Sequence, residues 1–548
     1  MMVTNSSCKL SKSQHERLEI STSMRYRQKS MYPAARHQMS TFKCLNKLRK
    51  SVATSTALAD TPLSDEIRVP ATTQTSTPTV APLYLGKKAV VVGAGPAGST
   101  AAMFLAREGF SVDVYERRPE PKADVVDSGR AYIIILIPRG KAALAELGIS
   151  LPTDPHFITQ GSVRHPPNGK VSVVKEAGNV TFSRSDLAQF LINEARSKYP
   201  DSIRFHFERG VEKVDLEKKQ VTFSSMSNPS AASAESNNEE GFQHSVTELI
   251  QYEMLIGADG AASAVRGALQ SHIPGYKVDI SDSGREYKVY MNLVGNIEPP
   301  EFKDNAGATL HLWSAKDDPF MSFTAHRNPD DTYSGTFSMC TGAHAKVQSV
   351  AAYEEILRTK FAGIPESWIP SIAQQVNGSP ASPAGKRIRC SQLGAPGVVL
   401  LGDAAHAVTP VFGQGANSSL ESGQVLGQAL KEANGDLESV PDTFDKLRKP
   451  DVHGLYEIDR KAFSFFSRKG PLDPDFLQLL SHVLLGTILS KIVPNLYGKQ
   501  PMLLQLGTAP YSKILSAVKR DAKVSAMVLI LIAMSIVLRM FFTSGSPA

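Results

Sequence analysis

A glycine-rich stretch at residues 89–116 limits the fold of this chain more than any other feature. It begins with a short apolar run, 89–92, that predicts a buried parallel strand. A turn with the spacing G-x-G-x-x-G follows at once, then a helical pattern over 97–108 and a second strand at 112–115. An acidic residue, Glu116, follows that second strand. Strand, glycines, helix, strand and acid in this order predict a Rossmann-like dinucleotide site rather than an unrelated glycine turn.

Each part of this motif has a physical role. The first glycine permits a tight turn, the second lets a pyrophosphate approach the backbone, and the third lets the helix pack close to the strand. The helix N-terminus supplies free N–H groups and a partial positive charge, and the acid can accept hydrogen bonds from a ribose diol. The candidate cofactor-binding residues of this motif are Gly93, Gly95, Ala97, Gly98, Glu116 and Arg117.

The positive charge of the chain is concentrated at its N-terminus. The formal net charge is +7, but residues 1–50 hold eleven Lys and Arg against two acids, a balance of +9, so the remaining residues sum to −2. A nearly neutral body argues against nucleic acid as a partner. The basic, Ser-rich start predicts an organelle-targeting segment, mitochondrial in preference to plastid, with a plain disordered tail as the alternative. The Thr-, Ser- and Pro-rich stretch 51–86 predicts a disordered linker, so the folded body should begin near Lys87.

The C-terminal end of the sequence predicts a membrane anchor. Residues 524–542 contain a single charge, Arg539, in nineteen residues, close to the roughly twenty that a spanning helix needs. Lys519, Arg520 and Lys523 flank the entry side, which by the positive-inside rule keeps the body in the cytosol, stroma or matrix. A buried core helix is the alternative.

The four cysteines indicate neither a metal site nor a disulfide framework. They lie far apart and form no C-x-x-C pair, which fits a reducing compartment. They are Cys8, Cys44, Cys340 and Cys390.

Two further apolar strands are each predicted to end at an acidic residue. The first leads to Asp259 and Gly260, and the second leads to Asp403. A turn at 410–415 with two glycines then precedes a helix, so its free N–H groups should face whatever lies beside Asp403. His406 has no Ser, Cys or metal-type partner at a suitable spacing, and we expect it to be structural.

Alternating polar and apolar segments between 287 and 340 predict an antiparallel sheet with one covered face, and hence a second domain. The polar stretch 228–241 predicts a surface loop.

The predicted fold class is α/β: a Rossmann-like cofactor-binding domain interleaved with an antiparallel-sheet substrate domain, then C-terminal helices and a terminal membrane helix. The expected boundaries are 1–50 (targeting-like segment), 51–86 (linker), 87–450 (both domains, with cofactor-binding parts at about 87–200, 246–285 and 385–450 and sheet parts at about 158–182 and 286–384), 451–518 (C-terminal helices) and 524–542 (membrane anchor).

Together the three motifs resemble those of the FAD-dependent aromatic hydroxylases, the class A flavoprotein monooxygenases. The motifs are GAGPAGS with Glu116, GADGAASAVR, and LLGDAAHAVTPVFGQGANSSLES, in this order. Within the family the resemblance is strongest to the kynurenine 3-monooxygenase branch, in SGRAYIIILIPRGKAALAELGI, FSRSDLAQFLINEA, KLRKPDVHGL and PNLYG. It extends over roughly 87–538 and includes a C-terminal helical region that ends in a membrane segment.

The resemblance implies bound FAD, NADPH as co-substrate, O2 and a small aromatic substrate. In such enzymes NADPH reduces the flavin, O2 adds to give a flavin C4a-hydroperoxide, and an electron-rich ring takes up its distal oxygen, so no side-chain nucleophile is needed. Beyond the first motif, the implied cofactor-binding residues are Arg130, Arg184, Asp259, Gly260, Asp403, Gly415, Ala416 and Asn417. The implied flavin-edge residues, which position the ring for catalysis, are Pro410, Gly413, Gln414 and Gly415.

The substrate contacts of the kynurenine 3-monooxygenase branch are only partly retained. Ser162 stands where the branch has a carboxylate-binding arginine, with Arg164 two residues later. The companion tyrosine falls near Glu176, an asparagine becomes Ala462, and Tyr497 matches. Residues two apart on a strand share a face, so Arg164 and Tyr497 are the candidate substrate residues. If Arg164 reaches the pocket the substrate is an aromatic acid, and otherwise it is a neutral aromatic.

Three other functions share parts of this pattern. A flavin-dependent halogenase would need a W-x-W-x-I-P segment, of which only Trp368-Ile369-Pro370 is present. A flavin-dependent reductase of isoprenoid double bonds would insert no oxygen into its product. A non-catalytic, membrane-tethered FAD-binding redox module would show no stimulation of NADPH oxidation by substrates. The sequence leaves open the substrate, NADPH against NADH, the oligomeric state and the organelle.

Overall fold

The computed structural model describes residues 82–121, 133–176, 178–225, 247–302, 307–467, 473–492 and 507–543. All of them belong to one compact unit that extends over Thr72–Ala548. The predictions that lie outside the described residues concern the segment 1–50, the linker up to residue 81, the loop 228–241, Arg130 and Tyr497.

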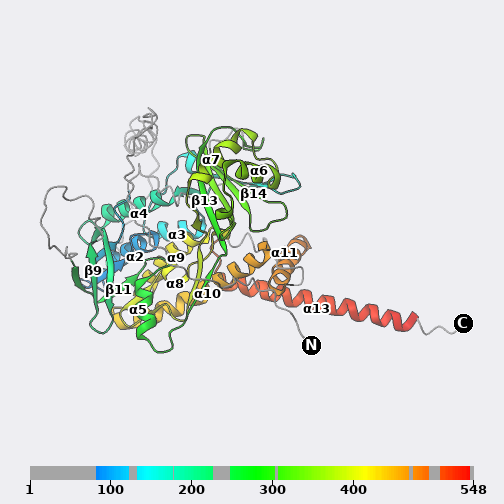
Figure 1. Cartoon of the computed structure of the whole chain (residues 1–548). Helices are drawn as coiled ribbons and strands as arrows, with labels where there is room; N and C mark the ends of the chain where they lie inside the picture. The colour runs from blue at the N-terminus through cyan, green and yellow to red at the C-terminus, as the bar shows by residue number, and fades with distance from the viewer. Residues whose placement is uncertain are drawn as a thin grey trace, which may run out of the picture. The chain divides into compact units, whose positions relative to one another are not determined.

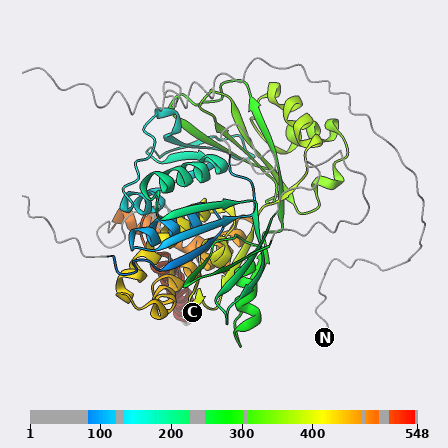
Figure 2. The ribbon, with the colours of Figure 1, turned by 90° about the vertical axis from the view of Figure 1, so that its left-hand side faces the viewer.

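A six-stranded sheet forms the centre of the Rossmann-like domain (Figure 2). Its order is β19-β20-β11-β1-β2-β7, and every neighbouring pair is parallel except β19 with β20. The chain adds β2 and β7 on one side of β1 and later β11 and β20 on the other, so ligands are expected at the carboxyl end of β1. The strands are β1 Lys88–Val92, β2 Ser111–Glu116, β7 Ile203–Phe207, β11 Met254–Gly257, β19 Gly394–Ala395 and β20 Val398–Leu400.

Helix α2 is the central helix of this domain, in contact with β1, β2, α4 and α9. Two glycines of α9 permit its close approach. A Cβ built on Gly423 would lie 2.8 Å from Thr100 Cγ2, and one on Gly427 would lie 2.5 Å from Phe104 Cδ1. The helices are α2 Pro96–Arg107, α3 Pro138–Glu146, α4 Arg184–Lys198, α5 Ala264–His272, α8 Asp403–His406 and α9 Gln414–Ala433.

Three smaller sheets surround this centre. An antiparallel sheet of order β10-β9-β8 packs on it, with Tyr115 of β2 stacked on Phe223 of β9 at 3.8 Å between ring centroids. The pairs β3–β6 and β12–β18 are also antiparallel. The strands are β3 Ile133–Leu136, β6 Val180–Ser183, β8 Arg209–Asp215, β9 Gln220–Ser225, β10 Thr247–Gln251, β12 Val278–Asp282 and β18 Lys386–Cys390.

The second domain is built on a seven-stranded sheet of order β17-β13-β16-β15-β14-β4-β5. The prediction of an antiparallel sheet fails at one pair, because β4 and β14 are parallel. β4 comes from an early part of the chain and joins through a long crossover, which permits parallel pairing where a hairpin does not. The strands are β4 Thr159–His165, β5 Ser172–Lys175, β13 Arg285–Leu293, β14 Ala308–Ser314, β15 Ser322–Arg327, β16 Tyr333–Cys340 and β17 Ser382–Pro383.

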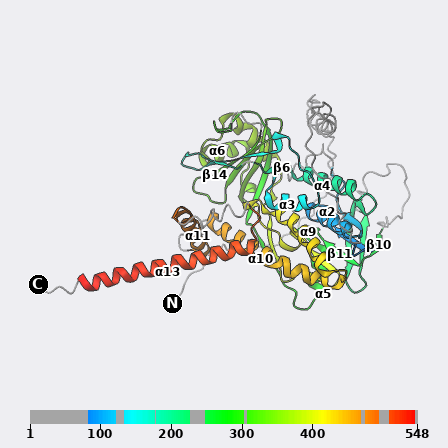
Figure 3. The same cartoon turned by 180° about the vertical axis from the view of Figure 1, so that it is seen from behind.

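The two faces of the seven-stranded sheet differ. Helices α6 (Val350–Lys360) and α7 (Ile369–Gly378) cover one face, where a buried cluster of large apolar side chains joins strands and helices (Figure 1). Because side chains alternate along a strand, the residues between these side chains point to the opposite face, away from α6 and α7. Helices α3 and α9 lie on that side of the sheet in Figures 1 and 3, and we call this the inner face. By strand alternation and register the inner face includes Ser162, Arg164, Arg285, Tyr287, Val289, Leu310, Leu312, Ser322 and Thr324.

The C-terminal helices are α10 (Val440–Ser467), α11 (Pro474–Ile492) and α13 (Tyr511–Thr543). The first turns of α13 are part of the protein core, where Ile514 and other apolar residues pack against α10. The later part has exposed apolar side chains and packs on no other element in Figures 1 and 3. Among the described residues, α13 is the one helix long and apolar enough to cross a membrane.

The predicted start of the folded body needs correction. The folded body begins before Lys87, because Tyr84 is 1% exposed, stacks on Phe110 and donates a hydrogen bond to the Leu430 carbonyl at 2.8 Å. Helix α3 begins at Pro138, since proline is favourable at the first position of a helix.

Candidate active site

The loop between β1 and α2 has the steric properties that a dinucleotide requires. Gly93 has a φ of +103°, and a Cβ built on it would lie 2.4 Å from the carbonyl oxygen of Ala258. A Cβ on Gly98 would lie 1.9 Å from the carbonyl oxygen of Gly93, so only glycine lets α2 approach the loop this closely. Gly95 is the N-cap of α2 and has nothing within 4 Å of a built Cβ. The helix N-terminus is therefore open where a pyrophosphate would meet it, and the loop fits FAD.

Glu116 ends β2, and backbone donors fix its carboxylate beside this loop. The N–H of Ala94 donates to Oε2 at 3.0 Å, and the N–H of Arg118 donates to Oε1 at 3.1 Å. The carboxylate is half-buried, and its further lone pairs can accept from a ribose diol. The neighbouring predicted residue, Arg117, has an exposed side chain.

Asp259 and Gly260 follow β11 and lie next to the first loop, because Ala258 contacts Gly93. The Oδ2 atom of Asp259 accepts from the N–H of Ala264 at 2.6 Å, so the carboxylate stabilises the start of α5. Its Oδ1 atom is buried without a hydrogen-bond partner among the described residues, and burial raises the pKa of the carboxyl. An unpartnered buried acceptor suits a donor on a bound cofactor.

Gly402 brings the third motif against the first. It has a φ of +56°, and a Cβ built on it would lie 2.8 Å from the Cβ of Ala97 at the start of α2. Asp403 begins α8 rather than ending a strand, because β20 ends at Leu400. The Asp403 side chain is exposed, yet surrounding protein atoms raise the pKa of its carboxyl, and the charge of Arg184 acts in the opposite direction. The Asp403 carboxylate thus reaches solvent although protein atoms lie close around it. Such a carboxylate could accept hydrogen bonds from a ribityl chain that would cover it.

The predicted flavin-edge segment is a short 3-10 turn, Pro410–Phe412, that enters α9 through Gly413 in the left-handed region. Built Cβ atoms on Gly413 and Gly415 meet nothing within 4 Å, so the backbone is open there. Gln414 is different, because its side chain is buried and engaged by protein. Its Nε2 donates to the Phe412 carbonyl at 2.9 Å, and its Oε1 accepts from the Tyr511 hydroxyl at 2.7 Å.

Asn417 is also engaged by the protein. Its Oδ1 accepts from the N–H of Ile137 at 3.0 Å, and its Nδ2 donates to the carbonyls of Ile135 at 2.9 Å and Gly413 at 3.1 Å. These bonds tie β3 and α3 to the start of α9, next to half-buried Ala416. The side chains of Gln414 and Asn417 therefore brace the segment, and a cofactor contact there would have to come from the backbone.

A buried charge cluster behind this segment was not predicted from the sequence. The guanidinium of Arg139 lies 3.9 Å from the ring centroid of Tyr511 and pairs with Glu421. Arg448 donates to the other oxygen of Glu421 at 2.6 Å. Helical spacing could have identified Glu421 as a residue on one face of α9, but its two partners come from α3 and α10 and no local pattern reveals them.

The segment is held from its other side by Asp459 of α10. The Thr409 hydroxyl donates to the Oδ1 of Asp459 at 2.6 Å, and Arg387 of β18 donates to the Oδ2 at 2.8 Å.

His406 is buried, and its Nε2 lies 2.9 Å from the Ser422 hydroxyl. Burial lowers the pKa of His406 to about 3. It is neutral at physiological pH and packs in the core, in agreement with the structural role expected for it.

The predicted substrate residues are less well supported. Arg164 lies on β4, on the same face as Ser162, but its side chain is exposed. Glu176 accepts a hydrogen bond from Asn179 Nδ2 at 3.0 Å, and Ala462 is fully buried. Within the described part of the chain, no group of three or more His, Cys, Asp or Glu could hold a metal ion.

Comparison with protein families locates two known domain types in the chain. The NAD(P)-binding Rossmann-like domain family matches residues 91–126, and the FAD binding domain family matches residues 181–453. Among solved structures, the fold is similar to PqsL, a probable FAD-dependent monooxygenase from Pseudomonas aeruginosa, with a TM-score of 0.54 at 16% identity over 72% of this chain and 99% of that one. Fold and loops together define an FAD-binding flavoprotein of the Rossmann-like class.

Curated relatives identify the family. Kynurenine 3-monooxygenase of Caenorhabditis briggsae is 30% identical over 387 residues, 67% of this chain and 79% of the relative. The enzymes of Legionella pneumophila (strain Lens) and Caenorhabditis elegans are 28% and 27% identical, and the latter match extends over 80% of this chain and 94% of the relative. The chain belongs to the family of FAD-dependent aromatic hydroxylases that includes the kynurenine 3-monooxygenases, and it is an FAD-dependent monooxygenase.

Proposed function

We propose that this chain holds FAD where its three motifs meet, and that it hydroxylates a small aromatic molecule with NADPH and O2. The observation that carries the proposal is the contact between the motifs. A Cβ on Gly93 would lie 2.4 Å from the Ala258 carbonyl oxygen beside Asp259, and one on Gly402 would lie 2.8 Å from Ala97. Glycines are needed at both contacts. Asp259 directly follows Ala258 and Asp403 directly follows Gly402 in the chain, and Glu116 accepts a hydrogen bond from the N–H of Ala94 beside Gly93.

FAD, when bound, supplies the activation of O2 that no amino acid side chain can provide. The chain would bind and shield it. The open helix N-terminus at Gly95 would receive the pyrophosphate, Glu116 the adenosine ribose, and Asp403 the ribityl hydroxyls. The backbone of 410–415 would border the ring and help to exclude water, because water would divert the activated oxygen from the substrate.

The proposed reductant is NADPH, approaching past Asp259, Gly260 and Arg184, and the proposed substrate is an aromatic small molecule related to kynurenine. The test uses purified full-length protein in detergent, loaded with FAD. NADPH oxidation is recorded with no addition, with kynurenine, and with a panel of other aromatic acids and amides. At least one aromatic should accelerate the oxidation. The proposal fails if none of them does, or if the protein retains no flavin.

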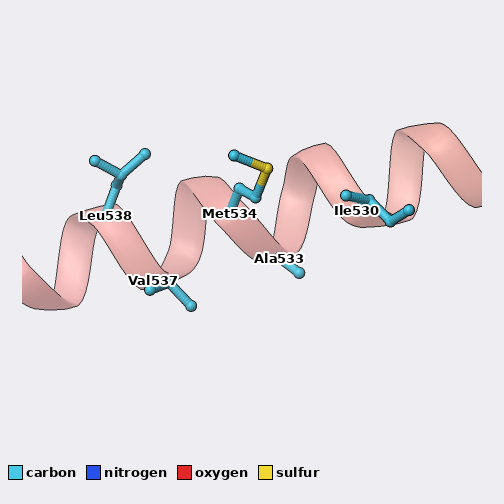
Figure 4. Close-up of a pocket in the computed structure, with 5 residues that line it drawn as sticks. All are labelled: Ile530, Ala533, Met534, Val537 and Leu538. Atoms are coloured by element: carbon cyan, nitrogen blue, oxygen red, sulfur yellow. The ribbon is translucent and has the colours of Figure 1, made fainter.

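We also propose that the later part of α13 anchors the enzyme in a membrane, with residues 1–50 as a mitochondrial targeting segment. Figure 4 shows that the helix surface there consists of apolar side chains, namely Ile530, Ala533, Met534, Val537 and Leu538. Exposed apolar side chains along several turns are costly in water, and a bilayer would cover them. Carbonate extraction of cell membranes tests this, because a protein released without detergent has no such anchor.

A further inference from the structure

Arg285, the first residue of β13, lies on the inner face of the seven-stranded sheet. It is opposite Cys340 in the β13–β16 register. Alternate residues of β13 turn the other way: Lys288 donates from Nζ to the Val376 carbonyl of α7 at 2.8 Å, and Tyr290 stacks on Phe323 in the helix-covered cluster. Because side chains alternate along a strand, Arg285 points away from these helices.

The Arg285 guanidinium is only partly satisfied. Its Nη2 donates to the Ser322 hydroxyl at 2.6 Å, while its buried Nε has no hydrogen-bond partner among the described residues. Burial lowers the pKa of this half-buried guanidinium, while Cys340 and Asp318 act in the opposite direction. Within the described part of the chain the Arg285 guanidinium forms no ion pair. In contrast, the buried arginines at 139, 387 and 448 each have a carboxylate partner. A half-buried cation without a counter-charge is unfavourable unless an anion joins it.

Arg285 also lies close to the predicted flavin edge. Its carbonyl accepts from the N–H of Ala384 at 2.9 Å. The next residue, Gly385, is against Pro410, since a Cβ built on it would lie 3.7 Å from Pro410 Cδ. An anion bound by Arg285 would therefore lie on the side of the sheet and at the edge where the substrate ring must meet the flavin.

Arg164 cannot share this role. It is on β4, four strands away from β13 in the sheet order, which corresponds to about 19 Å across the sheet at the usual strand spacing. The register places Arg164 in one row across the sheet with Leu312, Thr324, Thr336 and Val289. Arg285 does not belong to that row. The two arginines therefore lie in different rows as well as on distant strands.

We propose that Arg285 binds the carboxylate of the substrate, which makes an aromatic acid the preferred substrate class. This inference rests on the proposed monooxygenase function. The planar guanidinium would use its free Nε and a neighbouring nitrogen as a bidentate donor, and Ser322 would fix its orientation. The carboxylate would then be bound on the same face as position 162 but at a different place in the sheet, because β13 lies four strands from β4.

The experiment compares an acid with its amide on FAD-loaded, full-length protein. Anthranilate and anthranilamide form the matched pair, and kynurenine is a second acid. Each is titrated while the flavin absorbance is recorded, for wild type, Arg285→Gln, Arg285→Lys and the control Arg164→Gln. We expect wild type to bind an acid more tightly than the amide. Arg285→Gln should raise the Kd of the acid about 10- to 100-fold and leave that of the amide unchanged. Arg285→Lys keeps the positive charge but loses the planar pair of N–H donors, and it should raise the Kd of the acid several-fold. Arg164→Gln should have no effect.

The inference is overturned if Arg285→Gln binds the acids as wild type does, or if Arg164→Gln causes the loss instead. It is also overturned if wild type prefers the amide. In that case stimulation of NADPH oxidation by the amide would leave the monooxygenase function standing, so the two failures differ. Should Arg285→Gln lose its flavin on purification, Arg285→Lys decides, since an unchanged Kd for the acids in that variant would contradict bidentate binding.

Discussion

Gly98 sets the tightest steric limit in the cofactor loop, while Gly95, three residues before it, faces open space. A Cβ would lie 1.9 Å from the Gly93 carbonyl oxygen in the first case and would meet nothing within 4 Å in the second. The same chemical change therefore tests two different properties. Gly98→Ala strains the protein itself, and Gly95→Ala introduces a methyl group only where the pyrophosphate is expected.

We predict that Gly98→Ala lowers the free energy of unfolding by about 1–3 kcal/mol or more, even without FAD, because a backbone oxygen cannot move away. Gly95→Ala should leave the stability of the apoprotein unchanged and weaken FAD binding. Thermal unfolding of the apoproteins and titration with FAD measure the two effects. Equal losses of stability in both variants would contradict the assignment of Gly95 to the pyrophosphate.

The two carboxylates of the site lead to a second prediction. Glu116→Ala and Asp403→Ala each remove a charged acceptor for a sugar or ribityl hydroxyl, which costs roughly 1.5–3 kcal/mol and weakens FAD binding about 10- to 100-fold. The exposed neighbour Arg117 provides the control, since Arg117→Ala should change little. Purification of both acid variants with a full complement of flavin would contradict the roles proposed for them.

Helix α13 has two different parts along one continuous element. Its first turns are in the core, where His482 and Asp521 form a buried pair at 2.7 Å, and its later turns expose apolar side chains. The first turns of α13 are therefore part of the fold, because Ile514, Val518 and Asp521 are buried. Hydropathy alone identified the apolar segment, but the buried first turns depend on contacts with α10 and α11, which hydropathy cannot reveal.

Truncation should therefore have different effects at two positions. A chain that ends at Lys523 keeps the buried turns, and we predict that it leaves the membrane and retains FAD. A chain that ends at Lys513 removes Ile514, Val518 and Asp521, and should lose stability and flavin. Membrane fractionation and flavin content distinguish them. Equal flavin content in the two truncated proteins would show that the first turns of α13 carry no part of the fold.

Tyr511, the first residue of α13, links this helix to the predicted flavin edge through its hydrogen bond to Gln414. We predict that Tyr511→Phe keeps the fold and the FAD, because Arg139 can still lie over the ring, but raises the fraction of NADPH oxidised without product. Loss of one buried hydrogen bond of about 1 kcal/mol should loosen the segment without unfolding it. Comparison of H2O2 formed with NADPH consumed measures this, and unchanged coupling would contradict a positioning role for Tyr511.

At the scale of the whole molecule, the sequence predicted the Rossmann-like order and the three acidic motifs, because glycine spacing and buried apolar strands are local patterns. It could not predict the parallel β4–β14 pair, or that Gln414 and Asn417 are engaged by protein. Those features depend on partners far away in the sequence, such as Ile135 for Asn417 and Tyr511 for Gln414. Local sequence patterns thus locate the cofactor motifs. Tertiary contacts decide which of the side chains in these motifs remain available to a cofactor.

Acid lability is a property of the whole fold. His165, His344 and His406 are buried, and burial lowers their pKa values to about 4, about 4 and about 3 from an ordinary value of 6.5. Below pH 6.5 these three histidines bind protons in the unfolded chain but not in the native one, so their contribution to stability falls as pH decreases toward 4. We predict a progressive drop in the melting temperature of the FAD-loaded protein between pH 6.5 and 4.5. A constant or rising melting temperature over this interval would contradict neutral burial of these histidines.

The central claim is that this flavoprotein transfers one oxygen atom from O2 to an aromatic ring. The most direct measurement is the product mass after incubation of the FAD-loaded enzyme with NADPH, ¹⁸O2 and the aromatic that best accelerates NADPH oxidation. The account predicts a product heavier than the substrate by one ¹⁸O atom, and no such product without NADPH. A product that gains only hydrogen, or NADPH oxidation that yields H2O2 alone with every aromatic tested, would contradict it.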